Sequence, residues 1–143
     1  MRTRRGFLKN TGGLIAICCY SGIAPFLNSC INIVYVQFSK LKNKLVIKKV
    51  DMAENQYVLL NLDNVKAPIY LTKLSDQKFS ALYLLCTHKG CEVRPAGDIL
   101  ICPCHGSEFS NTGKVLKSPA ERNLASYLVT SDNENIYIHL NKR

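Results

Sequence analysis

The amino-acid sequence predicts an all-β fold from residue 33 onward. Apolar and β-branched residues occur there in short alternating segments, each about the 5–6 residues of an average strand. Turn-forming residues separate several of these segments, as at Asp63-Asn64 and Ser75-Asp76. No stretch of about twelve residues repeats its apolar positions with the 3.6-residue period of a helix. The predicted strands cover residues 33–38, 45–50, 57–62, 69–74, 79–85, 99–101, 124–130 and 136–140.

Composition restricts the classes of protein to consider. The 143 residues are 47% hydrophobic and 20% charged, which suits one modest globular domain with an appendage. No run of 18 or more uninterrupted apolar residues occurs, so a multi-pass membrane protein is excluded. The net charge is +9, without an arginine-rich patch or an aromatic platform outside the N-terminus. We therefore expect no nucleic-acid partner.

The first thirty residues resemble an export signal. Arg4 and Arg5, followed by Phe7, Leu8 and Lys9, precede a largely apolar stretch over residues 14–27. A basic start and a short hydrophobic core are typical of secretory signals, and the arginine pair resembles a bacterial twin-arginine signal. The expected organisation is a signal or membrane anchor over residues 1–30 and a folded domain over residues 31–143.

The sequence around Cys30 allows three interpretations of this segment. The sequence Leu27-Asn28-Ser29-Cys30 resembles a lipobox, in which Cys30 would be lipidated and become the mature N-terminus. The alternatives are an uncleaved signal anchor and a cysteine without a role. The first two readings place the domain in the periplasm or on the outer, periplasmic face of a bacterial cytoplasmic membrane, attached to the membrane through its N-terminus.

Two loops with cysteine and histidine interrupt the β pattern. The first reads Cys86-Thr87-His88-Lys89-Gly90-Cys91, and the second begins Cys102-Pro103-Cys104-His105. Two thiolates and two imidazoles suit a tetrahedral zinc ion, or an iron–sulfur cluster in which histidines replace two thiolates. Each loop also has an additional cysteine, and in an exported protein such a pair is expected to form a disulfide.

These loops closely resemble the two cluster-binding loops of Rieske iron–sulfur proteins, in the branch that carries a disulfide. The resemblance implies an antiparallel β sandwich over residues 31–143 and one Rieske-type 2Fe–2S cluster. It assigns Cys86 and Cys102 to one iron and His88 and His105 to the other. It also assigns Cys91 and Cys104 to the disulfide. A weaker similarity covers residues 68–127, where Gly113 and Pro119-Ala120 resemble the third loop that covers the cluster.

Residues beside these ligands are expected to adjust the reduction potential. Gly90 and Gly106 would let backbone amides approach the cluster sulfurs, and Ser107 occupies the position of a hydroxyl donor in the family. Phe109 stands where the high-potential branch typically has a tyrosine, so one donor is missing. Lys89 stands where quinol-oxidising relatives usually have leucine against the cytochrome b subunit. Because Phe109 lacks that donor, the expected potential is below that of the most oxidising members.

Three functions are consistent with these residues. The first is the iron–sulfur subunit of a quinol–cytochrome c reductase-like complex, with cytochrome b or c subunits and quinol as partners. The second is the small Rieske subunit of an exported molybdenum enzyme of the arsenite-oxidase type, with a molybdopterin subunit as partner. The third, from another class, is a structural zinc-binding module. We expect an electron-transfer subunit rather than a self-sufficient enzyme. A cytoplasmic ferredoxin of a ring-hydroxylating oxygenase is disfavoured.

Other histidines and lysines receive structural interpretations. His139 alternates within a terminal strand and is expected to have a structural role. A group of lysines early in the domain is expected to be a solvated strand surface rather than a docking face; it comprises Lys40, Lys42, Lys44, Lys48 and Lys49.

Overall fold

The computed structural model describes residues 33–142, which belong to a compact unit spanning Ile31–Arg143. The export signal predicted for residues 1–30, including Cys30, lies outside the described residues. No helix within the described part is long and apolar enough to cross a membrane. The elements in chain order are β1 (Ser39–Leu41), β2 (Lys44–Lys48), the 3₁₀ helix η1 (Lys49–Met52), β3 (Tyr57–Leu60), β4 (Ile69–Ser75), β5 (Lys78–Tyr83), β6 (Arg94–Ala96), β7 (Ile99–Ile101), β8 (Glu108–Ser110), β9 (Val115–Lys117), β10 (Ser126–Ser131) and β11 (Asn135–Lys142).

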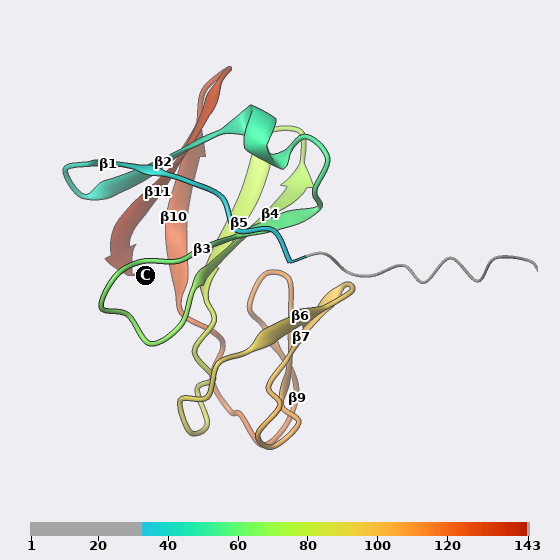
Figure 1. Cartoon of the computed structure of the whole chain (residues 1–143). Helices are drawn as coiled ribbons and strands as arrows, with labels where there is room; N and C mark the ends of the chain where they lie inside the picture. The colour runs from blue at the N-terminus through green and yellow to red at the C-terminus, as the bar shows by residue number, and fades with distance from the viewer. Residues whose placement is uncertain (1–32, 143) are drawn as a thin grey trace, which may run out of the picture. The chain divides into compact units, whose positions relative to one another are not determined.

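The strands form two antiparallel sheets, which confirms the all-β prediction. The larger sheet has seven strands in the order β1-β2-β11-β10-β5-β4-β3. The smaller sheet has four strands in the order β6-β7-β8-β9 and lies beyond the end of β5, at the bottom of the view in Figure 1. Its two ends connect to the larger sheet through the chain segments after β5 and before β10.

Alternation along the central strands divides their side chains between two cores. In β3, Val58 and Leu60 enter a core with residues of β2 and β11, whereas Tyr57 and Leu59 face a second core. Successive side chains of a strand point to opposite faces, so strands with a core on each side are buried throughout. The second core also takes Leu100 and Phe109 from the smaller sheet. It therefore joins the two sheets and holds the loops between them.

The smaller sheet places three loops near one another. The first cysteine–histidine loop connects β5 to β6, and the second connects β7 to β8. The segment between β9 and β10 forms the third loop, which includes a cis peptide bond between Ser118 and Pro119. Each of the three loops is bounded on at least one side by a short strand of the smaller sheet, and the hydrogen bonds of that strand fix one end of the loop.

Some predicted elements differ from those in the structure. Residues 33–38 are not a strand, because this segment makes only an isolated parallel bridge between Tyr35 and Leu59. Two backbone hydrogen bonds, from Val36 to Leu59 and from Leu59 to Val34, hold it beside β3. The helix η1 and the short strands β1, β6, β8 and β9 were not predicted, since elements of three or four residues show little periodicity; of the three-residue strands only β7, whose residues are all apolar, was predicted. Residues 49 and 50, predicted as the end of a strand, belong to η1.

Candidate metal centre

The first loop is closed by two backbone hydrogen bonds around Cys86. The amide of Cys86 donates to the carbonyl oxygen of Cys91 at 2.8 Å, and the amide of Gly90 donates to the carbonyl oxygen of Cys86 at 2.9 Å. Gly90 has a φ of +73°, a conformation that is costly for residues with a Cβ atom. The glycine therefore permits the tight turn that presents the side chains between Cys86 and Cys91.

The second loop repeats the same backbone arrangement. The amide of Cys102 donates to the carbonyl oxygen of Ser107 at 2.8 Å, and the amide of Gly106 donates to that of Cys102 at 2.9 Å. Gly106 has a φ of +74°. Both glycine amides therefore close the turns that present the candidate ligands.

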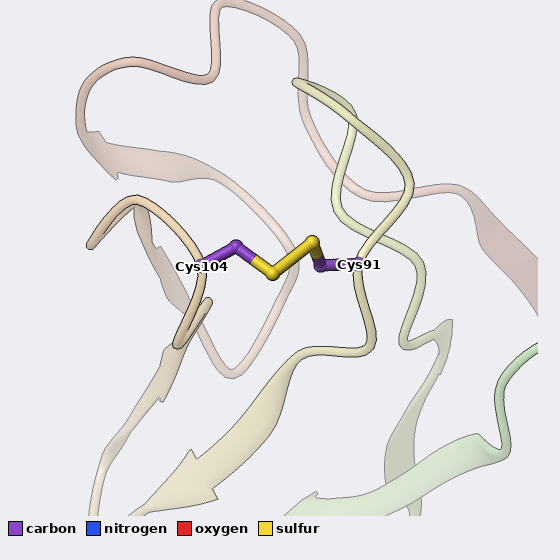
Figure 2. The surroundings of a disulfide bond; sticks show 2 residues. All are labelled: Cys91 and Cys104. Carbon is purple, nitrogen blue, oxygen red and sulfur yellow. A yellow bond between two sulfur atoms is a disulfide. The ribbon is translucent and has the colours of Figure 1, made fainter.

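A disulfide joins the two loops, as predicted. Cys91 and Cys104 form the bond, and their Cα atoms lie 6.5 Å apart (Figure 2). Cys91 is half-buried and Cys104 is exposed, so the bridge lies toward the outer side of the loops. It covalently limits the distance between the two loops.

The two remaining cysteines of these loops are free thiols in the second core. Cys86 is 3% exposed and Cys102 is 1% exposed. Burial raises the pKa of the Cys102 thiol, and the adjacent Cys86 side chain acts in the same direction. Backbone amides of Cys104 and His105 hydrogen-bond to Cys102 and oppose this rise, because such donors stabilise a thiolate. These two amides belong to the turn that Gly106 closes, and they approach the sulfur of a candidate ligand.

The two histidines of the loops lie against each other on the more exposed side. The ring centroids of His88 and His105 are 4.9 Å apart, with an edge-to-face arrangement. His105 is exposed and His88 is half-buried. The Nδ1 atom of His88 is buried and has no hydrogen-bond partner. A buried ring nitrogen without a partner is costly in a folded protein, and a coordinated metal would remove that cost.

The four candidate ligands form a sulfur pair and an imidazole pair. Within the part of the chain that the structure describes, the one set of three metal-binding side chains with donor atoms within 4.8 Å of one another is Cys91, Cys102 and Cys104. Two of these sulfurs are already joined in the disulfide and offer no thiolate. Separate sulfur and nitrogen pairs suit a two-iron cluster with different ligands on each iron. The donor set present therefore fits the 2Fe–2S cluster that the resemblance implies.

Ser107 connects the second loop to the third. Its side chain is fully buried, and its hydroxyl oxygen accepts a hydrogen bond of 3.0 Å from the amide of Ala120. A hydroxyl that accepts one bond retains its proton for a second acceptor. Ser107 can therefore donate to a cluster sulfur while the third loop holds it in place.

Sequence reasoning did not identify the contact between the first and third loops. The hydroxyl of Thr87 donates to the carbonyl oxygen of Arg122. Thr87 stands between two candidate ligands, but its partner is 35 residues away, and nothing in the local sequence indicates the pairing. The contact joins the first loop to the third loop.

The structure places the other candidate residues as follows. Phe109 is completely buried in the second core with the free thiols, whereas Lys89 is exposed on the first loop. His139 lies on β11, and its Nε2 atom is 3.0 Å from the hydroxyl oxygen of Thr130. This position supports the structural interpretation of His139.

Comparison with known proteins identifies the family. The model of the Rieske [2Fe-2S] domain matches residues 39–128. The chain is 35% identical over 75 residues to the cytochrome b6-f complex iron-sulfur subunit of Prochlorococcus marinus (strain MIT 9303), a match that covers 50% of this chain and 42% of that protein. The chain thus spans less than half the length of this curated relative.

Two solved structures are also similar. One is the cyanobacterial plasma membrane Rieske protein from Synechocystis PCC 6803, with a TM-score of 0.55, 34% identity, and coverage of 64% of this chain and 93% of that chain. The other is a complex of reduced oxygenase and oxidized ferredoxin in carbazole 1,9a-dioxygenase, with a TM-score of 0.57, 25% identity, and coverage of 72% and 98%. These similarities imply a single Rieske 2Fe–2S cluster. The chain belongs to the Rieske [2Fe–2S] domain family.

Proposed function

We propose that the chain transfers single electrons through a 2Fe–2S cluster held by Cys86, His88, Cys102 and His105. The observation that carries the proposal is the arrangement of two buried thiols and two adjacent imidazoles on loops with the same backbone turn. When bound, such a cluster accepts and releases one electron. Cys86 and Cys102 would hold its buried side, and His88 and His105 would hold the side nearer to solvent.

The surrounding residues would adjust the affinity of this site for an electron. Neutral imidazoles replace two anionic thiolates, which favours the reduced state and gives potentials of about −150 to +300 mV in centres of this type. The Ser107 hydroxyl would stabilise additional negative charge by donating a hydrogen bond. Phe109 occupies its buried position without a donor. We therefore infer a potential below the upper end of that range.

We propose further that the chain works as the iron–sulfur subunit of a quinol–cytochrome c reductase-like complex. The relatives named as cytochrome b6-f subunits support a cytochrome-containing partner. Electrons would enter from quinol near the exposed His105 and leave to a cytochrome. The twin-arginine resemblance supports operation in the periplasm or on the outer face of the cytoplasmic membrane, with attachment through the N-terminus or through a lipid on Cys30.

Lys89 favours a second candidate for the electron donor. Its charged side chain is exposed on the first loop, beside His88. A cation there is costly to bury against an apolar quinol pocket and is better suited to a polar protein surface. A molybdopterin subunit of an arsenite oxidase-type enzyme is therefore the alternative partner.

A redox titration of the purified chain, followed by EPR spectroscopy at two pH values, tests the proposed function. A Rieske-type signal with a pH-dependent potential is expected, because imidazole ligands lose protons more readily in the oxidised state. A positive potential would favour a quinol donor, and a potential below zero would favour another donor. Zinc in protein from iron-replete cells, with no redox-active signal, would support the structural zinc module and contradict electron transfer.

A further inference from the structure

The positive charge of the chain is concentrated in its first fifty residues. Residues 1–50 contain nine of the 19 lysine and arginine residues and none of the 10 acidic residues. Residues 51–143 consequently hold ten of each sign and are formally neutral. In the described domain, this excess lies on β1, β2, their connecting turn and the first residue of η1.

The turn beside the end of β2 carries acidic residues. Lys48 pairs in register with Asn135, at the start of β11. The next residue, Lys49, donates its backbone amide to the carbonyl oxygen of Glu134 at 2.8 Å. The turn that includes Glu134 also carries Asp132, whose carboxylate accepts hydrogen bonds from within the turn. The charge of Lys49 is therefore partly balanced by this acidic turn, where it interacts with Asp132.

The other end of β2 has no such balance. We call Lys40, Leu41, Lys42 and Lys44 the basic hairpin. Its three lysines form no ion pair with any residue of the described chain, where the ion pairs join Lys73 to Asp76 and Lys117 to Glu108. Leu41 is 57% exposed among these lysines. The basic hairpin thus combines unpaired positive charge with an exposed apolar side chain.

Backbone contacts fix the basic hairpin to the neighbouring strand. The amide of Leu140 donates to the carbonyl oxygen of Asn43 at 2.9 Å. Lys44 is opposite Leu41 on one side and opposite His139 on the other. Residues opposite one another in antiparallel strands lie on the same face of the sheet. The outer face of the sheet is therefore shared by Leu41, Lys44 and His139. Leu45, the next residue along β2, is buried on the inner face.

An open hollow lies at this end of the sheet. Its volume is about 530 Å³, and it is lined by Leu41, Lys42, Asn43, Lys44, His139 and Asn141. The lining offers two ammonium groups and includes no carboxylate. Its two asparagine side chains hydrogen-bond to each other, and the Nε2 atom of its imidazole lies 3.0 Å from the hydroxyl oxygen of Thr130. Such a set of hydrogen-bond donors and positive charges suits a phosphate group.

The sequence alone favours a solvated surface for these lysines, but with the unpaired charges, the exposed Leu41 and the hollow in view, we propose that the basic hairpin is a docking surface for the phosphate headgroups of an anionic membrane. Lysines near an anionic surface bind its headgroups, and an exposed leucine among them can enter the boundary between headgroups and acyl chains. The predicted anchor at Cys30 precedes Ile33 by three residues, which span at most about 10 Å. Such an anchor would keep the domain at the membrane, where even a weak surface contact is populated.

The distribution of the lysines argues against a role limited to protecting the sheet edge. Lysines on edge strands prevent pairing between sheets. In this chain, however, Lys44 lies on β2, which is paired on both sides, by β1 and by β11. The basic hairpin also lies in the larger sheet, away from the loops beside the smaller sheet (Figure 1). Membrane contact there would leave the candidate metal centre uncovered.

Vesicle binding by the full cluster-loaded chain tests the proposal. Partitioning would be measured onto phosphatidylcholine vesicles with and without 30% phosphatidylglycerol, for the wild type and two triple variants. Lys40→Gln/Lys42→Gln/Lys44→Gln neutralises the basic hairpin. Lys66→Gln/Lys78→Gln/Lys114→Gln, at three other exposed lysines, changes the net charge equally. We expect the hairpin variant to lose about a hundredfold in partitioning onto anionic vesicles at low salt, and the control variant to lose less than about threefold.

The N-terminal segment is common to all three proteins, so their differences report on the domain surface. Equal losses in the two variants would indicate general charge attraction and would overturn the proposal. Unchanged vesicle binding by the hairpin variant would also overturn it, and slower electron transfer from that variant to an acidic cytochrome would then assign the surface to a protein partner.

A fluorescent reporter tests the orientation independently. The chain has no tryptophan, so Leu41→Trp introduces a single one at the basic hairpin. Leu116→Trp is a matched control on β9, because Leu116 is 53% exposed, close to the value for Leu41. We expect the emission of the Leu41→Trp variant to shift to shorter wavelength on anionic vesicles, and that of the Leu116→Trp variant to stay unchanged. A shift in both variants, or in neither, would contradict docking through the basic hairpin.

Discussion

The amide of Ala120 donates a hydrogen bond of 3.0 Å to the hydroxyl oxygen of Ser107, which joins the third loop to the second cysteine–histidine loop. Both residues are buried, with exposed fractions of 2% and 0%. The bond orients a hydroxyl whose proton is free for another acceptor. One contact thus links the packing of the third loop to the electrostatics of the proposed cluster site.

Replacing Ser107 with alanine is expected to change stability and potential together. The Ala120 amide would stay buried without an acceptor, which costs about 1–3 kcal/mol of unfolding free energy. Loss of the hydroxyl donor would lower the midpoint potential, by roughly 40 mV for about 1 kcal/mol of differential stabilisation. Denaturant titration and potentiometry measure the two effects. Ser110→Ala is the control, because its hydroxyl accepts from the Lys114 amide at 3.1 Å but lies outside the loop; it should lower stability without changing the potential.

Replacing Phe109 with tyrosine is expected to raise the midpoint potential. The added hydroxyl would supply the donor that the high-potential branch of the family has at this position, and a gain of about 1 kcal/mol corresponds to roughly 40 mV. The measurement is a potentiometric titration followed by EPR. Phe79→Tyr, in the other core, is the matched control and should not change the potential. An unchanged or lower potential in Phe109→Tyr would contradict the assigned role.

Replacing His105 with alanine is expected to abolish cluster binding, because one iron would lose a ligand. Iron and sulfide content and the EPR spectrum measure the loss. His139→Ala is the control, since His139 contacts Thr130 on the larger sheet and should leave the cluster content unchanged. Full cluster content in the His105→Ala variant would falsify the ligand assignment.

The ligands of the site were easier to predict than the contacts that hold their loops in place. Cys86 and His88 are two residues apart, and Cys102 and His105 are three residues apart; these residue types at such short spacing are typical of metal ligands. The disulfide between Cys91 and Cys104 followed from the two cysteines left over. Larger strands such as β4 were predicted because alternation extends over several residues.

The parts that sequence reasoning missed depend on contacts between distant residues. Strands β8 and β9 have three residues each, too few to show a period. The bond from Thr87 to Arg122 spans 35 residues, and the bond from Ala120 to Ser107 spans 13.

Alanine substitutions at three glycines are expected to differ in their cost. At Gly90 and Gly106, an added Cβ would meet no atom within 4 Å, so only the positive φ opposes it, at about 1–2 kcal/mol. At Gly113, where φ is +84°, the added Cβ would also lie 2.8 Å from the Cδ2 atom of Leu82, a fully buried core residue. Overpacking adds about 1–3 kcal/mol. Denaturant unfolding should therefore rank Gly113→Ala as the most destabilised; equal values for all three variants would contradict the steric argument.

Removing the disulfide with Cys91→Ala/Cys104→Ala is expected to lower the free energy of unfolding by about 3 kcal/mol, because the bridge closes a loop with a sequence separation of 13 residues. The same substitutions free the two loops to separate, so the cluster should also be lost sooner during incubation in air. Denaturant titration and the decay of visible absorbance measure these effects. A reductant is the internal control: it should destabilise the wild type toward the value of the variant and leave the variant unchanged. If the variant retained wild-type stability and cluster lifetime, the β-strand pairing and core contacts of the loops would suffice to hold them, and the clamping role of the disulfide would be wrong.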